Sequence, residues 1–241
     1  MERYIRQLSL AEFGAEGQRR LSRAHVLVVG LGGLGSVLSY CLAGMGVGRL
    51  TLADPDRVEI HNLDRQFLYT EDDVDQPKVL AAARRLETVN HHVTVQPIER
   101  AFTSDTVISA NQFDLVVAAT DSRTSRLDIN RVCCEMDTPL VCGGVAGLYG
   151  TLQVVIPGRT PCIRCAGGKE PWTDHAPSPA PVVSALSALM AQAAVGVLCG
   201  WDLPQNELVI LDAKRFELER VPLYRTEGCP HCGGLTEETP C

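Results

Sequence analysis

The chain of 241 residues lacks three features: an apolar N-terminal leader, a net positive charge and an internal repeat. Its first six residues include charged side chains and no apolar stretch follows them, so we expect no signal peptide and a cytoplasmic protein. The net charge of −7 argues against a nucleic-acid-binding surface. No stretch has the composition of a linker, so we expect one domain with an N-terminal arm (1–24), a core (25–150) and a C-terminal part (151–241).

Charged residues are also missing between His175 and Asp202. The stretch from Val182 to Cys199 consists mostly of Ala, Ser, Gly and Val, with Gln192 inside it. Small residues allow a helix to pack closely against its neighbours. We therefore expect a buried or dimer-interface helix here, and no membrane span.

Ten cysteines are present, and four of them form two Cys-x-x-Cys pairs, Cys162 with Cys165 and Cys229 with Cys232. Without a secretory signal, such cysteines are expected to be reduced, and some to bind a metal. Two pairs together make a tetrahedral four-cysteine site, which is typical of structural zinc. A redox pair and an incidental coincidence of thiols are the alternatives, and His231 could replace one of the ligands.

Apolar strand-like runs alternate with helical patterns between residues 25 and 145. This alternation predicts βαβ units and a mostly parallel sheet. From residue 150 onward, strands follow one another without helices, and 207–212 with 216–222 resembles a hairpin. We therefore predict an α/β fold, a Rossmann-like and mostly parallel sheet with an antiparallel C-terminal extension and a structural zinc knuckle.

A glycine-rich turn follows the first strand, which we place at 25–30, and precedes a helix of small residues, which we place at Ser36–Gly46. Its glycines match the pattern Gly-x-Gly-x-x-Gly, with Gly30 for the tight turn, Gly32 for close approach of the backbone to phosphate, and Gly35 for packing of helix on strand. Asp54 ends the next strand, where an acid would contact ribose hydroxyls. The pattern predicts a nucleotide site, but it does not separate NAD from ATP.

Three polar residues that follow the later strands help to distinguish ATP from NAD as the ligand. Arg65 lies in the loop after the second strand, Lys78 begins a helix, and Asp121 follows a buried strand. The carboxyl ends of parallel strands line one crevice. A dinucleotide does not need an arginine and a lysine there, whereas a triphosphate attacked by an anion does, because the two like charges repel each other. Asp121 could hold Mg²⁺ between phosphate oxygens.

Each of these three residues also has an ordinary structural interpretation. Arg65 could form a surface salt bridge, Lys78 could be an exposed charge on a helix, and Asp121 could be the N-cap of the next helix.

The ordered combination resembles the adenylating enzymes of ubiquitin-like proteins, most closely the bacterial ThiF/MoeB/HesA branch, which activates sulfur carrier proteins. The resemblance covers nearly the whole chain. It is carried by the paired cysteines and by residues 3–7, 29–35, 53–56, 62–66, 76–78 and 120–121.

The resemblance implies a reaction in which the C-terminal Gly-Gly carboxylate of the carrier attacks the α-phosphate of Mg-ATP, giving acyl-adenylate and pyrophosphate. It implies a single adenylation domain in a homodimer, with Arg6 reaching the neighbour's site. Arg6, Arg65, Lys78 and Asp121 would be catalytic, and Asp121 would bind Mg²⁺. The implied ATP-binding residues are Gly30, Gly32, Gly33, Gly35, Asp54, Asp56, Asn62, Arg65, Gln66, Lys78, Asp121 and Ser122.

The loop that would cross over the adenylate, about 166–181, departs from the family pattern because it contains no cysteine. Thr173 and Ser178 are poor substitutes for a thiolate, and Cys241 is a remote alternative. We therefore expect adenylation only, with sulfur supplied by a separate donor.

Three other functions are compatible with parts of the sequence. An NAD-dependent oxidoreductase fits the glycine turn but leaves Arg65, Lys78 and the cysteines unexplained. A non-catalytic module would use the fold only to hold a peptide tail. Within the family, the activated carboxylate could belong to a small peptide or to a modified tRNA base, although the acidic net charge disfavours the latter.

Overall fold

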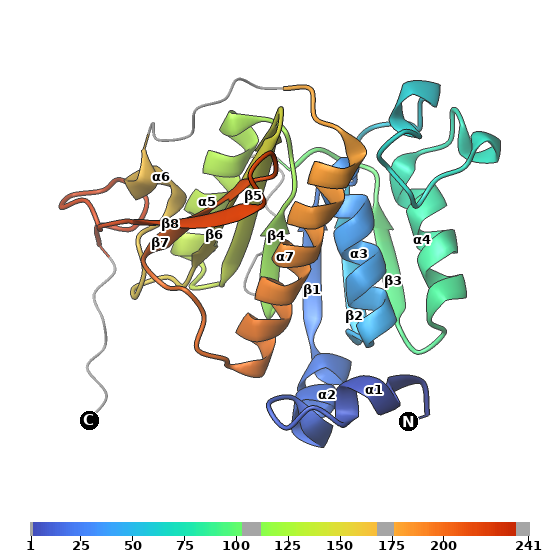
Figure 1. The fold of residues 1–241 in the computed structure, drawn as a ribbon, viewed down its shortest axis with the longest axis horizontal. Coiled ribbons are helices and arrows are strands. Elements are labelled where there is room, and N and C mark those ends of the chain that lie inside the picture. The colour runs from blue at the N-terminus through green and yellow to red at the C-terminus, as the bar shows by residue number, and fades with distance from the viewer. Residues whose placement is uncertain (1, 103–111, 168–175, 235–241) are drawn as a thin grey trace.

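The computed structural model describes residues 2–102, 112–167 and 176–234. Within these residues, eight strands form one sheet in the order β3-β2-β1-β4-β5-β6-β7-β8. The first five strands are parallel and the last three antiparallel (Figure 1), which confirms the predicted sheet and its C-terminal extension. The strands are β1 (His25–Val29), β2 (Arg49–Ala53), β3 (Thr94–Ile98), β4 (Leu115–Ala118), β5 (Leu140–Ala146), β6 (Tyr149–Val155), β7 (Glu207–Asp212) and β8 (Glu217–Pro222).

Helices cover both faces of the sheet. Figure 1 shows α3, α4 and α7 in front of the strands and α5 behind them. The α-helices are α1 (Ile5–Leu8), α2 (Gly14–Arg23), α3 (Gly33–Met45), α4 (Lys78–Val89), α5 (Arg123–Glu135), α6 (Ile163–Ala166) and α7 (Ala180–Cys199). The part of the chain that the structure describes also contains the short 3-10 helices η1 (Glu2–Tyr4), η2 (Ile60–Asn62) and η3 (Glu71–Asp73).

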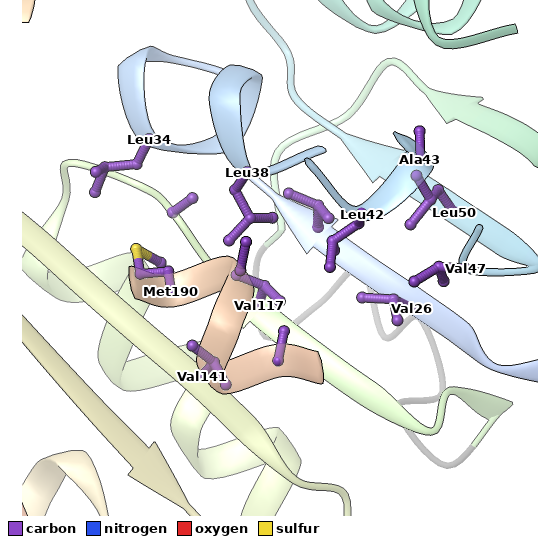
Figure 2. Packing of buried hydrophobic residues seen from close by; sticks show 14 of the residues in the cluster. Val26, Leu34, Leu38, Leu42, Ala43, Val47, Leu50, Val117, Val141 and Met190 are labelled. Atoms are coloured by element: carbon purple, nitrogen blue, oxygen red, sulfur yellow. The ribbon is translucent and has the colours of Figure 1, made fainter. Parts of the chain in front are cut away.

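The two faces of the sheet carry separate hydrophobic cores. Successive side chains of a strand point to opposite faces, so Val26 and Val28 of β1 lie in one core while Leu27 and Val29 lie in the other. Burial on both faces explains why β1 is an uninterrupted apolar run. Figure 2 shows Leu38 of α3 near side chains from β4, β5 and α7 in the first core.

The apolar helix α7 belongs to that core. It has 20 residues and is apolar enough to cross a membrane by length and composition, yet 61% of its most apolar window is buried inside this structure. A Cβ on Gly143 of β5 would overlap Sδ of Met190, so α7 packs closely on the sheet. This confirms the expected buried helix.

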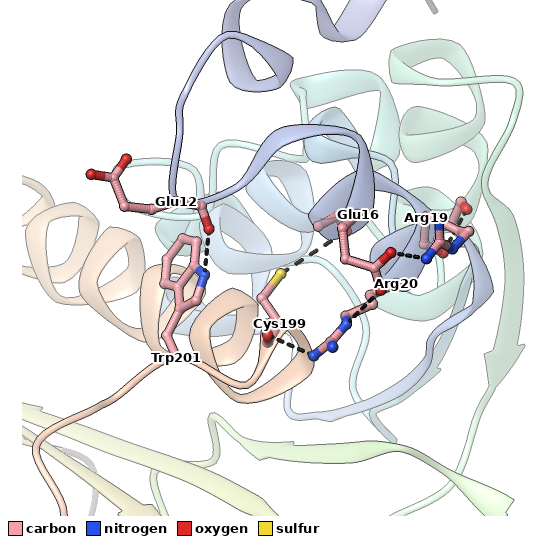
Figure 3. Close-up of polar contacts among 8 residues, drawn as sticks. Glu12, Glu16, Arg19, Arg20, Cys199 and Trp201 are labelled. Atoms are coloured by element: carbon pink, nitrogen blue, oxygen red, sulfur yellow. Dashed lines mark hydrogen bonds and ion pairs between the residues drawn. The ribbon is translucent and has the colours of Figure 1, made fainter.

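The N-terminal arm is fixed beneath the sheet, at the C-terminal end of α3 (Figure 1). The Asn90 side chain donates to the hydroxyl of Tyr4 (2.7 Å) and to the Ala43 carbonyl (2.8 Å). Figure 3 shows that α2 is also tied to the end of α7, because Arg20 donates to the Cys199 carbonyl at 2.8 Å and the Trp201 indole donates to the Glu12 carbonyl at 3.1 Å. The arm is therefore a packed part of the fold.

Candidate functional site

The glycine turn connects β1 to α3 and is tightly enclosed. Gly30 has a φ of +90°, and a Cβ there would lie 2.7 Å from the Ala119 carbonyl oxygen after β4. A Cβ on Gly35 would overlap the Gly30 carbonyl. The helix begins at Gly33 with Gly32 as its N-cap, so it starts three residues earlier than our prediction of Ser36. Its first amides therefore lie inside the glycine turn.

A cleft of about 780 Å³ opens beside this turn. It lies at the carboxyl ends of β1 and β4, where the strand order reverses, which is the usual ligand position in such sheets. Of the expected ATP-binding residues, only Gly35 does not line it, because Gly35 packs behind the turn. The others do: Gly30, Gly32, Gly33, Asp54, Asp56, Asn62, Arg65, Gln66, Lys78, Asp121 and Ser122.

Asp54 is buried at the end of β2, and its carboxylate already has two partners from its own chain. Oδ2 accepts from the Leu31 amide at 2.6 Å, and Oδ1 accepts from the Asp56 amide at 2.8 Å. Burial raises the pKa of the Asp54 carboxyl, and the Lys78 ammonium opposes that shift. Asp54 therefore supports the glycine turn in addition to lining the cleft.

Lys78 is buried, with a side chain that is 7% exposed, so it is not the surface charge that we considered as an alternative. Its Nζ lies 3.0 Å from Oδ2 of Asp56, whose side chain is 62% exposed. Arg65 is half-buried and donates to the His61 carbonyl at 3.0 Å and to the Asp64 carboxylate at 2.7 Å. Two cations thus lie along one side of the cleft.

Asp121 lies across the cleft, directly after β4. Ser122, and not Asp121, caps α5, because its hydroxyl accepts from the Ser125 amide at 3.3 Å. Arg126 was missed by our sequence analysis: it is buried, lines the cleft and donates through Nε to the Thr120 carbonyl at 3.2 Å. Its spacing of one helical turn from Ser122 does not by itself separate it from the other arginines of α5.

Two buried polar atoms in the cleft wall lack partners among the described residues, Oε1 of Gln66 and Oγ of Ser178. Leaving a buried polar atom without a hydrogen bond costs about 1–3 kcal/mol. A polar ligand in the cleft would supply these partners, so the lining fits a nucleotide.

Comparison with known proteins identifies the family. The model of the ThiF family matches residues 4–231. The chain belongs to the ThiF family. The resemblance that we drew from the sequence is therefore confirmed.

Among ThiF-family relatives, the chain is 35% identical over 243 residues to the sulfur carrier protein ThiS adenylyltransferase of Escherichia coli (strain K12), covering 96% of this chain and 95% of that protein. It is 37% identical over 246 residues to the sulfur carrier protein adenylyltransferase of Thermus thermophilus, covering 97% and 91%. The crystal structure of E. coli MccB with ATP has a TM-score of 0.85 at 24% identity, covering 96% of this chain and 73% of that one. At this level of identity, the similarity to MccB shows a shared fold.

The ThiF-family chain also brings its two Cys-x-x-Cys pairs together, and all four Sγ atoms lie within 4.8 Å of one another. The sulfur atoms of Cys162 are 3.8 Å from Cys229 and 3.9 Å from Cys165, and those of Cys165 and Cys232 are 3.5 Å apart. Zinc–sulfur bonds of about 2.3 Å in a tetrahedron place sulfurs about 3.8 Å apart. The set therefore fits a four-cysteine zinc site, and these distances far exceed a disulfide bond of about 2.05 Å.

Asn130 of α5 holds the two cysteine pairs in place. Its Oδ1 accepts from the Ile163 amide at 2.9 Å, and its Nδ2 lies 2.8 Å from Nδ1 of His231. His231 is thereby engaged with Asn130, while the four cysteines alone form the described metal-binding group. The same helix begins at the cleft, so α5 joins the cysteine cluster to the candidate active site.

Hydrogen bonding and burial shift the pKa values of the cysteine ligands in opposite directions. A hydrogen bond from Cys134 lowers the pKa of Cys162 to about 4, which favours the thiolate that a metal requires. Burial raises the pKa of Cys229, so a bound cation would have to displace that proton.

The crossover loop is only partly described. Ser178 lies at the cleft, whereas 168–175, which includes Thr173, falls outside the described residues, as does Cys241. Of the expected catalytic residues, Arg65, Lys78 and Asp121 line one cleft. Arg6 is exposed on α1 and does not line it.

Proposed function

We propose that this ThiF-family protein uses ATP to adenylate the C-terminal Gly-Gly carboxylate of a small ubiquitin-like sulfur carrier protein, releasing pyrophosphate. Two relatives with 35% and 37% identity over nearly their whole length carry names of this activity. Family membership also argues against an NAD-dependent oxidoreductase. The chain acts as a single adenylation domain in the cytoplasm, and a separate protein supplies the sulfur.

The observation that carries the proposal is the distribution of charge around one cleft. Lys78 and Arg65 come from the segment after β2, Asp121 and Arg126 come from the segment after β4, and the glycine turn follows β1, which lies between these two strands. A cleft that only held a neutral peptide would not need two cations beside a helix N-terminus.

The chemistry follows from these charges. An oxygen of the carrier carboxylate forms a bond to the α-phosphorus while the bond to the bridging oxygen of pyrophosphate breaks. Two unit charges about 4 Å apart repel by about 4 kcal/mol at an effective dielectric constant of about 20. Lys78 and Arg65 offset this repulsion and stabilise the departing pyrophosphate. No side chain has to act as a nucleophile, because positioning and charge stabilisation are sufficient.

Asp121 would hold Mg²⁺, which supplies further neutralisation of the phosphate charge. The carboxylate is exposed and lines the cleft at the end of β4, across from the segment after β2 that carries Lys78 and Arg65. Zinc at the four cysteines would have a structural role, since a closed four-thiolate site leaves no position for a substrate.

The position of the N-terminal arm supports a role for Arg6 at the site of another subunit. The N-terminal arm is fixed at the C-terminal end of α3, whereas the cleft lies at its N-terminal end. The 13 residues of α3 span about 20 Å. We therefore infer a homodimer in which Arg6 of one subunit contributes to the site of its partner.

The proposal is tested by ATP–pyrophosphate exchange with purified carrier proteins. Exchange should require a carrier that ends in Gly-Gly and should be lost when those two residues are removed. The truncated carrier is the matched control, since its folded part is unchanged. Exchange that proceeds equally with the truncated carrier, or with a short peptide alone, would contradict the carrier assignment.

Mixing two inactive variants tests the dimer. Arg6→Ala and Asp121→Ala should each be inactive alone. After subunit exchange at equal concentrations, half of the dimers are mixed and each has one complete site, so about a quarter of wild-type exchange should return. If Arg6 acted within its own subunit, both sites of the mixed dimer would be defective and no activity would return.

A further inference from the structure

Leu31, inside the glycine turn, has both of its backbone polar groups bound by buried side chains. Its N–H donates to Oδ2 of Asp54 at 2.6 Å, and its C=O accepts from the Tyr69 hydroxyl at 2.9 Å. Leu31 is fully buried and Tyr69 is 5% exposed. Tyr69 follows the polar loop after β2 and does not line the cleft.

The bond from Tyr69 fixes the direction of the next amide. In a planar trans peptide, the C=O of Leu31 and the N–H of Gly32 point in opposite directions. Because the C=O of Leu31 points to the buried hydroxyl, the N–H of Gly32 points away from it. Gly32 lines the cleft, and its N–H has no hydrogen-bond partner within the part of the chain that the structure describes.

The turn needs such an external constraint because of its own sequence. Leu31 lies between two glycines, and glycine has access to more backbone conformations than any other residue. A peptide between flexible neighbours can rotate unless something holds it. An amide that is already oriented when the ligand arrives binds a negative oxygen without reorganisation.

We propose that Tyr69 is a positioning residue for the nucleotide: its hydroxyl orients the Leu31–Gly32 peptide so that the Gly32 N–H donates to a phosphate oxygen of ATP. The inference rests on the proposed use of ATP at this cleft. Asp54 has the complementary task on the preceding peptide, since it holds the N–H of Leu31. Burial raises the pKa of Tyr69 well above its usual value, so the hydroxyl remains a donor at any working pH.

Tyr69→Phe tests the proposal because it removes the hydroxyl and keeps the ring. We expect the Kd for ATP, measured by calorimetry without carrier, to rise about five- to tenfold, as the loss of one hydrogen bond predicts. The KM for ATP in pyrophosphate exchange should rise by the same factor, with kcat within about twofold. The Kd for adenosine, which has no phosphate, should not change. A merely structural role would weaken the binding of adenosine and ATP equally, and that result would overturn the proposal.

Thr51→Val is the matched control, since it also removes a buried hydroxyl from this region, one that lies 2.8 Å from Nε2 of His25 and away from the cleft. It should lower stability by a similar amount and leave the Kd for ATP unchanged. An equal loss of ATP affinity in Thr51→Val would show that reduced stability alone explains the effect.

Gly32→Pro gives a second test, because Gly32 has a φ of −70°, which proline adopts, and proline has no amide hydrogen. In that background, Tyr69→Phe should cause no further loss of ATP affinity; a full additional loss would contradict the proposal. Normal ATP binding in Tyr69→Phe would overturn this inference alone, whereas absence of exchange with any Gly-Gly carrier in the wild type would overturn the proposed function.

Discussion

Replacing Asp121 or Arg65 by alanine should abolish ATP–pyrophosphate exchange in a protein that remains folded. Neither side chain belongs to the hydrophobic core: Asp121 is exposed and Arg65 is half-buried. In the proposed reaction, both act on the negative charge of the carrier carboxylate and the triphosphate. Loss of one such group from a preorganised site typically lowers kcat by about 10²–10³-fold. We expect at least that loss, with Tm within a few degrees of wild type.

The controls for this experiment are variants of the same residue types outside the cleft. Asp72→Ala in η3 and Arg85→Ala in α4 remove exposed charges that do not line it. Both should exchange at the wild-type rate, which separates a local effect from a change in net charge. Wild-type exchange in Asp121→Ala or Arg65→Ala would defeat the role that we assign to that residue.

Removal of zinc should produce the largest loss of stability. The cluster joins the segment after β6 to the segment after β8, and Asn130 attaches both to α5. Structural zinc contributes about 10–16 kcal/mol to small zinc-finger peptides. If zinc stabilises this protein by about a third of that free energy, its removal should lower the Tm by about 10 °C. A change of about 1 kcal/mol shifts the Tm of a chain of this size by about 2–4 °C.

Cys162→Ser is the direct variant and Cys41→Ser is its control. Cys41 is a partly buried cysteine of α3 outside the cluster. Cys162→Ser should lose its metal in elemental analysis, melt about 10 °C lower and become sensitive to protease around residues 223–234. Cys41→Ser should keep one zinc per chain. Protein purified without chelator that contains no zinc, together with a Cys162→Ser variant of unchanged Tm, would show that the cluster does not bind zinc.

Much of the fold could be predicted because its signals are local. Buried parallel strands such as β1 are continuous apolar runs, and the hairpin of β7 and β8 has its turn residues between two short strands. The start of α3 was predicted too late. Gly33 and Gly35 look like turn residues in the sequence, whereas in the structure they begin a helix in which Gly35 packs against Gly30 and Ala119, and Gly33 packs against Val183 of α7.

Several of the residues that line the cleft could be predicted from the sequence, but Arg126 could not. Residues at strand ends, among them Asp54 and Asp121, could be placed along one crevice because parallel strands end at the same edge of the sheet. Arg126 could not be distinguished from the other arginines of α5. Its guanidinium lies over the backbone of Gly144, where a Cβ would approach it within 2.8 Å, and Gly144 is 18 residues away on β5.

The sequence by itself determined the types of chemistry available: a glycine turn for phosphate, two cations and a carboxylate for the transfer, and four thiols for a metal. Residue type and short spacing carry that information. Only the tertiary structure decided which polar groups are already engaged by the chain and which face the cleft. The Tyr69–Leu31 bond joins residues 38 positions apart, and the Asn130–His231 contact joins residues 101 positions apart. Such pairs leave no periodic signal in the sequence, because they exist only once the sheet and its helices bring distant segments together.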